Sequence, residues 1–462
     1  MSHPDRRTSP HLPVAPIRRF ARPLAQFLQI ESASGFVLLV CTLFALVLAN
    51  SFAAPLYHAF WHTSVRLQIG GWELGGDLGH FVVNDVLMTI FFFVVGLEIK
   101  RELVAGELRD ARKAALPLVA ALGGMLVPAG IYMAIQVNHF SEPAFRGWGV
   151  PMATDIAFVV GIMAVLGKRV PFGLKIMLLS LAIADDIGAV IVIAAFYSTG
   201  LNWAMLAAAA CGFAGVRLLA RAGVRAVPVY ILAGALIWLA VYKSGVHPTV
   251  AGVMLGLLTP ASVWVGRDAL RLSVADLQAS LAEDHAGPDV DELELMAFAA
   301  KESVSPLERL EHRLHPWVGF AIMPLFALAN AGVHIELKAV TEPVSVAVML
   351  GLFLGKPIGV MLFSFAAVKL GIAKLPHGVT WPVLLGGGFL AGIGFTMSLF
   401  VAGLAFKGDE PLLADAKIGI LLGSVLSALV GVGVLVWTLR PNPGHKAGGA
   451  DTGETAGSAR AV

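Results

Sequence analysis

The chain alternates long runs of apolar residues with short polar stretches over most of its length. A transmembrane helix needs about 20 mostly apolar residues, and twelve runs approach or exceed this length. They cover residues 35–50, 79–98, 114–137, 149–167, 173–197, 201–219, 226–242, 245–260, 316–334, 344–368, 380–405 and 414–438. Composition agrees, because only 14% of the 462 residues are charged, against about 25% in soluble domains. The pattern predicts an all-α polytopic membrane protein with twelve transmembrane helices in a lipid bilayer.

Polar segments flank and interrupt this membrane domain, which we place at residues 33–440. Residues 1–32 are rich in proline and arginine and are predicted to form a flexible cytoplasmic N-terminal arm. Residues 441–462 are rich in glycine and alanine and are predicted to be a disordered cytoplasmic tail. Between the eighth and ninth spans, residues 261–312 form a long cytoplasmic loop with an acidic stretch. We expect that loop to be partly disordered.

A short polar segment between the first two spans has the pattern of a β-hairpin. Residues 64–75 alternate apolar and polar positions around Gly70-Gly71, a two-residue turn signal. The segment predicts a small extracytoplasmic hairpin whose unpaired edge is able to pair with a second copy of the chain. An ordinary connecting loop is equally compatible with this sequence.

Lysine and arginine fall mainly on one side of the predicted spans. If the N-terminus is cytoplasmic and successive loops alternate sides, 26 of the 33 lysines and arginines lie in cytoplasmic segments and six in outer segments. The remaining one, Lys356, lies within a span. The bias remains at 13 against six when both termini and the long loop are left out. Short cytoplasmic loops are enriched in these residues. The distribution therefore predicts that both termini are cytoplasmic.

Three aspartates, Asp155, Asp185 and Asp186, lie inside apolar runs, where each unpaired charge costs about 2.5–3.5 kcal/mol. Asp185 and Asp186 follow Lys175 by roughly 15 Å of helix, close to mid-membrane. Adjacent helical residues point about 100° apart, so the two carboxylates cannot share one face. Lys356 is the only mid-span lysine and is the candidate counter-ion for one aspartate. A purely stabilising ion pair is the alternative, but one lysine cannot neutralise three carboxylates.

Two of the spans carry residues that interrupt a helix. Pro151 and Thr154 precede Asp155 in the fourth span, and glycines at 386–388 and within 391–396 interrupt the eleventh. Irregular backbone at membrane depth is tolerated only where protein covers it or it lines a cavity. The two spans are the middle members of the triplets 3–4–5 and 10–11–12. This arrangement predicts inverted repeats with two broken, crossing helices and a midplane ion site, where Asp155 and Lys356 would offset the half-helix dipoles.

Other polar residues lie nearer the ends of the spans. Asp85 would either line an outer funnel or cap a helix start, and His247 is predicted to be a packed or interfacial histidine. A second group lies at the cytoplasmic ends of the second and ninth spans and consists of Glu98, Arg101, Glu102, Glu311, His312 and His315. Histidine titrates near physiological pH, so this group is a candidate for pH sensing. Solvated helix ends and a surface histidine pair are the alternatives.

Signatures of soluble enzymes and of cofactor binding are missing from the sequence. It contains no phosphate-binding loop, no zinc-type HExxH and no nucleophile elbow. We therefore predict a transporter that is not an enzyme, has no cofactor and binds no nucleic acid. An intramembrane aspartyl protease would need aspartates on facing helices, usually in a GxGD context, whereas the motif here is ADDIG. A sodium-coupled importer of a small organic solute on a similar fold remains the main alternative.

At these residues the chain resembles the NhaA-type bacterial sodium/proton antiporters. The matching stretches are residues 84–103, 153–161, 181–197, 243–253, 310–333, 355–360 and 391–400. With their spacing they cover nearly all of 30–440. Inverted repeats with broken helices are already documented for this family.

The resemblance implies electrogenic export of one cytoplasmic Na+ or Li+ for two external H+ across the bacterial inner membrane, with activation at alkaline pH. By motif, Asp186 and Asp155 would bind the cation and the protons. Asp185 would pair with Lys356, and Thr154 would accompany Asp155.

The resemblance also assigns the group of six residues from Glu98 to His315 to the alkaline-activation region, and the 64–75 hairpin to a homodimer. The chain departs from the compact family pattern in its N-terminal arm and in the enlarged 261–312 loop. That loop leads directly into the helix implied to sense pH. Among the family properties that the resemblance implies, the pH profile is therefore the one that applies least directly to this chain.

Overall fold

The computed structural model describes residues 31–69, 72–137, 143–198, 200–224, 226–282 and 290–440. Nearly all of the predicted N-terminal arm and the whole predicted tail lie outside these ranges.

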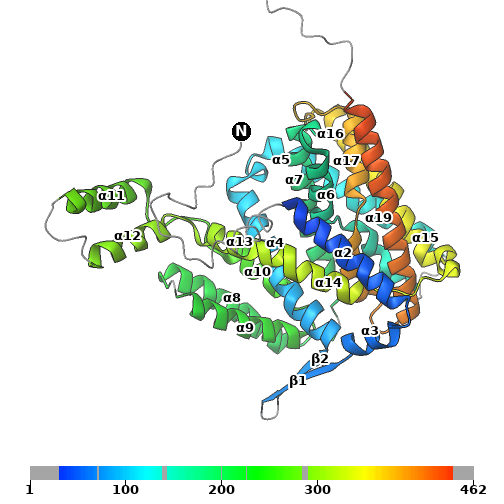
Figure 1. Cartoon of the computed structure of the whole chain (residues 1–462), viewed down its shortest axis with the longest axis horizontal. Coiled ribbons are helices and arrows are strands. Elements are labelled where there is room, and N and C mark those ends of the chain that lie inside the picture. The colour runs from blue at the N-terminus through cyan, green and yellow to red at the C-terminus, as the bar shows by residue number, and fades with distance from the viewer. Residues whose placement is uncertain are drawn as a thin grey trace, which may run out of the picture.

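The described chain is an all-α polytopic bundle of apolar helices (Figure 1). Eight helical spans are long and apolar enough to cross a membrane, and two bent helix pairs raise the number to ten. The eight are η1–α4 (Leu78–Leu87 and Met88–Ala105), α5 (Ala111–Ile135), η4–α6 (Pro143–Met152 and Ile156–Leu166), α7 (Phe172–Phe196), α8 (Trp203–Arg221), α9 (Val227–Ser244), α15–η8–α16 (Pro343–Leu350, Gly351–Gly355 and Lys356–Lys369) and α19 (Glu410–Thr438). The bent pairs are α2–α3 (Glu31–Ala49 and Ala54–Trp61) and α17–α18 (Trp381–Ala391 and Phe395–Ala405).

Two of the twelve predicted spans are shorter or more polar than a full apolar crossing. The predicted span 245–260 contains α10 (Thr249–Leu258), a helix of only 10 residues. It is shortened because Gly245 adopts a left-handed conformation with φ of 84° and Pro248 stands at the helix start. The predicted span 316–334 is divided among the end of α13 (Pro306–Trp317), η6 (Val318–Ile322) and α14 (Met323–Asn330).

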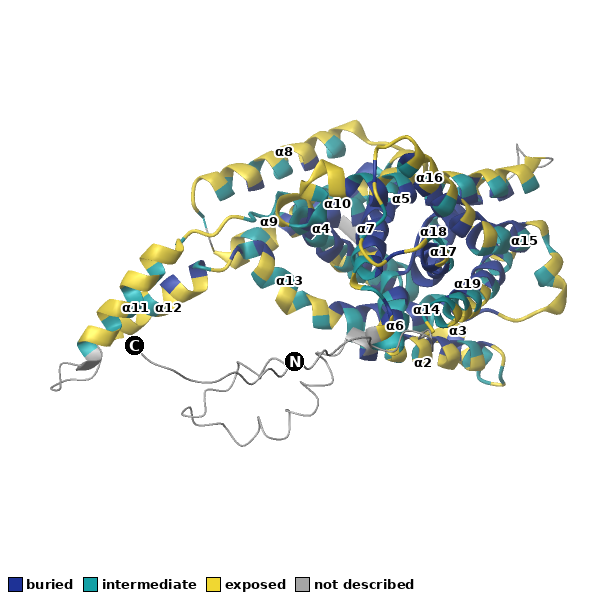
Figure 2. Cartoon of the chain, turned by 90° about the horizontal axis from the view of Figure 1, so that it is seen from above, coloured by how far each residue is buried: buried dark blue, intermediate teal, exposed yellow. Residues whose placement is uncertain are grey.

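The 261–312 loop contains more helix than the sequence suggested. Helices α11 (Arg267–Ala282) and α12 (Val290–Glu302) form a hairpin that projects from the bundle (Figures 1 and 2). Backbone N–H groups of Trp264 and Val265 donate to the Glu302 carbonyl at 3.1 Å, which ties the base of the hairpin together. Both helices have alanine- and leucine-rich sequences, which favour helix. Partial disorder of the loop stays a prediction, because residues 283–289 of its acidic stretch lie outside the described residues.

A two-stranded antiparallel sheet also projects from the bundle (Figure 1). Strand β1 (Ser64–Ile69) pairs with β2 (Trp72–Asp77) in a register that places Ile69 opposite Trp72. Short 3-10 turns complete the described chain: η2 (Glu107–Arg109), η5 (Gly167–Arg169) and η7 (Leu337–Thr341).

Small residues let the helices that carry the site pack backbone to backbone. A Cβ at Gly359 of α16 would lie 2.1 Å from the Gly123 carbonyl oxygen of α5, and one at Gly252 of α10 would lie 2.3 Å from the Thr89 carbonyl oxygen of α4. Such close crossings are typical of helix packing in lipid. Burial is concentrated on α7, α17 and α18 at the centre, whereas α8 is largely exposed (Figure 2). The central helices therefore form the rigid frame for the buried charges.

Candidate functional site

The two broken spans touch each other at their breaks. The first break separates η4 from α6, where Asp155 is the N-cap and its Oδ1 accepts from the Phe158 N–H at 3.3 Å. The second break separates α17 from α18, whose axes differ by 46°. The backbone N–H of Asp155 donates to the Ile393 carbonyl at 2.7 Å. A backbone N–H group at the first break thus hydrogen-bonds to a backbone carbonyl at the second break. Buried peptide groups need such partners.

Asp155 lies between the N-termini of two half-helices. Its Oδ2 accepts from the Thr396 backbone N–H at 2.9 Å and from the Thr396 hydroxyl, and both residues are buried. Helix N-termini carry partial positive charge and favour anions. Sequence analysis did not select Thr396 as a site residue. Its signal was present, because a small polar residue stands two positions after Gly394, in the first turn of the helix that begins at Phe395.

Asp185 and Lys356 form a fully buried ion pair, with Lys356 Nζ 2.5 Å from Asp185 Oδ2. Thr154 Oγ1 lies 2.7 Å from the same carboxylate oxygen and 2.8 Å from the Ala391 carbonyl oxygen. A threonine hydroxyl has one proton, so it donates to only one of these acceptors at a time. Thr154 therefore links the ion pair on α7 and α16 to the break in the eleventh span.

Asp186 is the buried carboxylate that faces the cavity. It adjoins Asp185 on α7 and, unlike Asp185, lines a cavity of about 860 Å³ together with Thr154, Asp155 and Thr396. Its Oδ1 has no hydrogen-bond partner among the described residues. Buried carboxylate oxygens are normally satisfied, and hard cations prefer oxygen ligands. Asp186 and Asp155 therefore place two carboxylates on one cavity, beside a threonine on each helix break.

The cavity extends from this site to the charged group that the sequence predicts to sense pH, and five members of that group line it: Glu98, Arg101, Glu311, His312 and His315. Arg101 donates to Glu311 Oε1, and His315 Nδ1 lies 3.7 Å from Glu98 Oε1. Burial raises the pKa of Glu311, and the Arg101 guanidinium opposes that rise. These five residues share one polar mouth.

Glu102, predicted in the same group, belongs to a different cavity. Its Oε1 accepts from Ser180 Oγ at 3.2 Å and from the Glu107 backbone N–H at 2.9 Å. It lines a cavity of about 650 Å³ with Arg109 and Lys113. The structure therefore separates Glu102 from the other five residues, although it is close to Glu98 in sequence.

Asp85 lies near the end of the π-helix η1 and is buried. The helix-start alternative is therefore wrong, because Asp77 is the residue that precedes this helix. His247 Nε2 lies 3.6 Å from Asp85 Oδ1, and the two residues form a polar cluster that does not line the cavity.

Three buried aromatic rings on α18, α4 and α14 pack together, and one of them, Phe400, touches His247 beside Asp85. Phe400 of α18 packs against Phe92 of α4, with centroids 5.3 Å apart, and against Phe326 of α14, with centroids 6.2 Å apart. Phe400 stands one helical turn after Thr396, whose side chain holds Asp155. We call these three contacting rings the aromatic barrier, which Phe400 joins to the helix that carries Thr396.

Broken helices that meet at buried charges, with a cavity leading to them, are features of secondary active transporters. The chain belongs to the family described as Na+/H+ antiporter 1, whose model matches residues 25–435.

Similar proteins cover almost the whole chain. The Na(+)/H(+) antiporter NhaA of Rhodopirellula baltica is 49% identical over 94% of this chain and 97% of its own length. The NhaA 2 of Sorangium cellulosum is 48% identical over 98% and 99%, and the NhaA of Rhizobium meliloti is 47% identical over 93% and 98%. These names do not favour the sodium-coupled importer.

Proposed function

We propose that this protein is an electrogenic antiporter that exports cytoplasmic Na+ or Li+ in exchange for external protons and is activated at alkaline pH. The observation that carries the proposal is the pair of buried carboxylates, Asp186 and Asp155, on one cavity. Asp186 has a carboxylate oxygen without a hydrogen-bond partner in the described part of the chain, which suits a transported cation. Asp155 is held by helix N-termini, which stabilise its ionised form.

In this mechanism Na+ and protons compete for the same two carboxylates. When the site faces the cytoplasm at high pH, Asp186 and Asp155 are ionised and accept Na+ through oxygen ligands. When it faces the acidic exterior, they release Na+ and take up one proton each. Exchanging one Na+ for two protons moves one net charge per cycle. Asp185 remains neutralised by Lys356 throughout.

The proposal also includes the orientation of the membrane domain in the bilayer. We place both termini in the cytoplasm and the protein in the bacterial inner membrane. Twelve crossings result if α10 and the α13–η6–α14 run are counted with the ten apolar spans. The breaks in η4–α6 and α17–α18 would occupy matching positions of two inverted repeats, and rocking of one helical group against the other would switch access.

We also propose that the chain forms a homodimer through the β1–β2 sheet on the outer side. Among the described residues the sheet has two strands, so each strand has one edge that is not paired within the sheet, and such edges template pairing with a second copy. Light scattering of the detergent-solubilised protein with and without residues 64–77 measures this. A deleted chain that stays dimeric would exclude the hairpin as the interface.

Ion specificity and electrogenicity are tested together in reconstituted vesicles. We expect Na+ and Li+, but not K+, to dissipate an imposed ΔpH, with activity rising between about pH 6.5 and about pH 9 as carboxylates and histidines lose protons. An imposed voltage should change the rate, because each cycle moves a net charge. A voltage-independent rate would contradict the stoichiometry of two to one, and the absence of any Na+-dependent proton flux would contradict antiport.

For the pH response, we propose that the Arg101–Glu311 pair at the cavity mouth sets part of the activation profile. Replacing Arg101 by Gln removes the positive charge that lowers the pKa of Glu311, so this carboxyl stays protonated to higher pH. The pH of half-maximal antiport should then rise by about 0.5–1 unit. This shift is at the lower end of the usual effect of a neighbouring charge, because solvent screens the partly exposed Arg101. The matched control is Arg271→Gln on α11, where the arginine pairs with Asp268 at the surface. A shift toward acidic pH, or an equal shift in the control, would contradict this role.

A further inference from the structure

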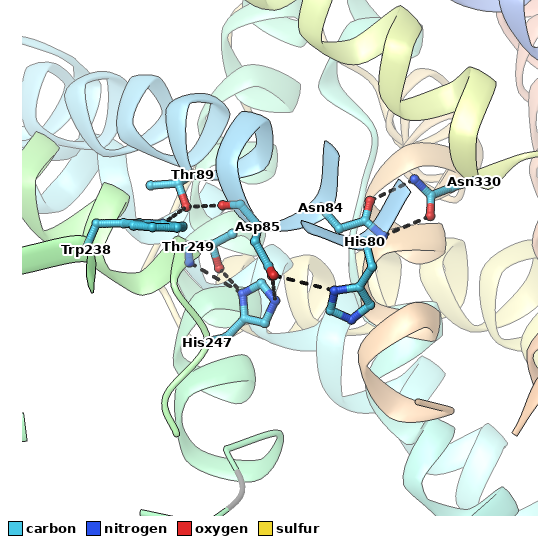
Figure 3. Close-up of polar contacts among 8 residues, drawn as sticks. All are labelled: His80, Asn84, Asp85, Thr89, Trp238, His247, Thr249 and Asn330. Atoms are coloured by element: carbon cyan, nitrogen blue, oxygen red, sulfur yellow. Dashed lines mark hydrogen bonds and ion pairs between the residues drawn. The ribbon is translucent and has the colours of Figure 1, made fainter. Parts of the chain in front are cut away.

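A second cluster of titratable residues surrounds Asp85 (Figure 3). His80 Nδ1 is 3.5 Å from Asp85 Oδ2, and His247 Nε2 is 3.6 Å from Asp85 Oδ1. One buried carboxylate therefore has an imidazole at each oxygen.

The two histidines differ in their access to solvent. The side chain of His80 is 39% exposed, whereas that of His247 is 10% exposed and that of Asp85 is 5% exposed. His80 begins the second span directly after the β1–β2 sheet, which we have placed on the outer side. External water therefore reaches His80 first, and Asp85 lies behind it.

The contacts of His247 define its role in the cluster. Its Nδ1 accepts from the Thr249 backbone N–H at 3.4 Å and lies 2.8 Å from the Thr249 hydroxyl. Because a backbone N–H only donates, Nδ1 is an acceptor and the proton of neutral His247 is on Nε2. That proton faces Asp85 Oδ1. At 3.6 Å Nε2 is too far for a hydrogen bond, and it has no hydrogen-bond partner among the described residues. His247 thus occupies one oxygen side of Asp85 and leaves the other oxygen to His80.

The cluster is held in place by neighbouring helices. Thr89 Oγ1 donates to the Asp85 carbonyl at 2.5 Å and accepts from Trp238 Nε1 at 3.0 Å. Asn84 and Asn330 exchange side-chain hydrogen bonds of 3.2 and 2.8 Å, which fasten η1 to α14 (Figure 3).

The cluster also contacts the helix that holds the ion site. The His247 ring meets the Phe400 ring edge to face at 5.3 Å. Phe400 belongs to the aromatic barrier and to α18, which also provides Thr396 for Asp155. Among the described residues, the charges of Lys407 and His80 also act on His247, and the charge of Asp85 acts on Tyr242.

We propose that His80 and Asp85, backed by His247, form an outer proton-loading station for the antiport cycle. This inference deepens the proposed function and rests on it. External water gives a proton to Nε2 of neutral His80, and the Nδ1 proton passes to Asp85 Oδ2. His80 returns to its neutral form as the other tautomer, and one external proton is held on Asp85. Contraction of the 3.5 Å separation by less than about 1 Å gives a normal hydrogen bond for this transfer. The proton moves on to the ion site through water once the aromatic rings separate.

The test compares two fluxes in right-side-out membrane vesicles. His80→Gln keeps a polar side chain but cannot relay a proton. We expect it to slow proton-driven Na+ efflux by about 3–10-fold when external protons are scarce, near about pH 8.5. Isotopic Na+/Na+ exchange, which needs no proton, should stay within about twofold of the unmodified chain. The defect should vanish at low external pH, and added imidazole should restore His80→Ala.

The matched control is His62→Gln, because His62 also lies beside an aspartate, Asp77, at 2.9 Å on the same side of the bundle. It should change neither flux. Equal slowing of both fluxes in His80→Gln would show a structural role and overturn the proposal, as would an unchanged proton-driven flux. Failure of the proposed antiport function is a different result, because the unmodified chain would then show no proton-driven Na+ efflux.

Discussion

Asp186→Asn should lower Na+-dependent proton flux at least about 100-fold, because an amide neither releases a proton nor offers a negative charge to Na+. The substitution preserves size, and Oδ1 of Asp186 has no hydrogen-bond partner among the described residues, so little packing is lost. We therefore expect normal yield and thermal stability in detergent. Proton flux in everted vesicles, with Na+ binding by calorimetry, measures the effect.

The matched control for this prediction is Asp268→Asn. Asp268 is an almost fully exposed aspartate on α11, remote from the cavity. It should leave flux unchanged. Full exchange in Asp186→Asn would mean that the cation does not depend on this carboxylate, and the competition mechanism would fail.

Removing the amine of Lys356 should have the largest effect on stability. Lys356→Gln leaves Asp185 fully buried without its counter-charge, and breaking a buried pair in this way costs about 3–5 kcal/mol. The double substitution Asp185→Asn with Lys356→Gln leaves no buried charge at this pair, so it should recover most of the loss. Thermal inactivation of the detergent-solubilised protein measures both changes.

The same pair of variants separates a structural role from a transport role. If the ion pair only stabilises the fold, the double variant will transport normally. If Lys356 takes part in the cycle, the double variant will be stable but slow. A single Lys356→Gln variant as stable as the unmodified chain would contradict the burial argument itself.

The energetic cost of charges in apolar runs was sufficient to predict which charged residues are buried in the bundle. Asp155, Asp185, Asp186 and Lys356 were selected because lipid does not solvate unpaired charge, and all four lie at the centre of the bundle. Helix periodicity also showed that Asp185 and Asp186 face different ways. It did not decide which of them meets Lys356, because that depends on how α7 is rotated against α16.

Local signals were weaker at the edges of the membrane domain. Gly245 and Pro248 shorten α10, although its apolar run is long enough to suggest a full span. The acidic composition of the 261–312 loop suggested disorder, but α11 and α12 pack against each other. Amino-acid composition alone does not predict that helix–helix contact.

By itself, the sequence determined the class of the protein, placed most of its apolar spans and predicted which buried charges carry its chemistry. These follow from local energetics, namely hydropathy, charge in lipid and helix-breaking residues. Only the tertiary structure decided which groups meet: Thr396 with Asp155, Lys356 with Asp185, and His247 with Asp85. Each contact joins elements far apart in the chain or fixes the rotation of a helix, and packing of whole helices sets that geometry.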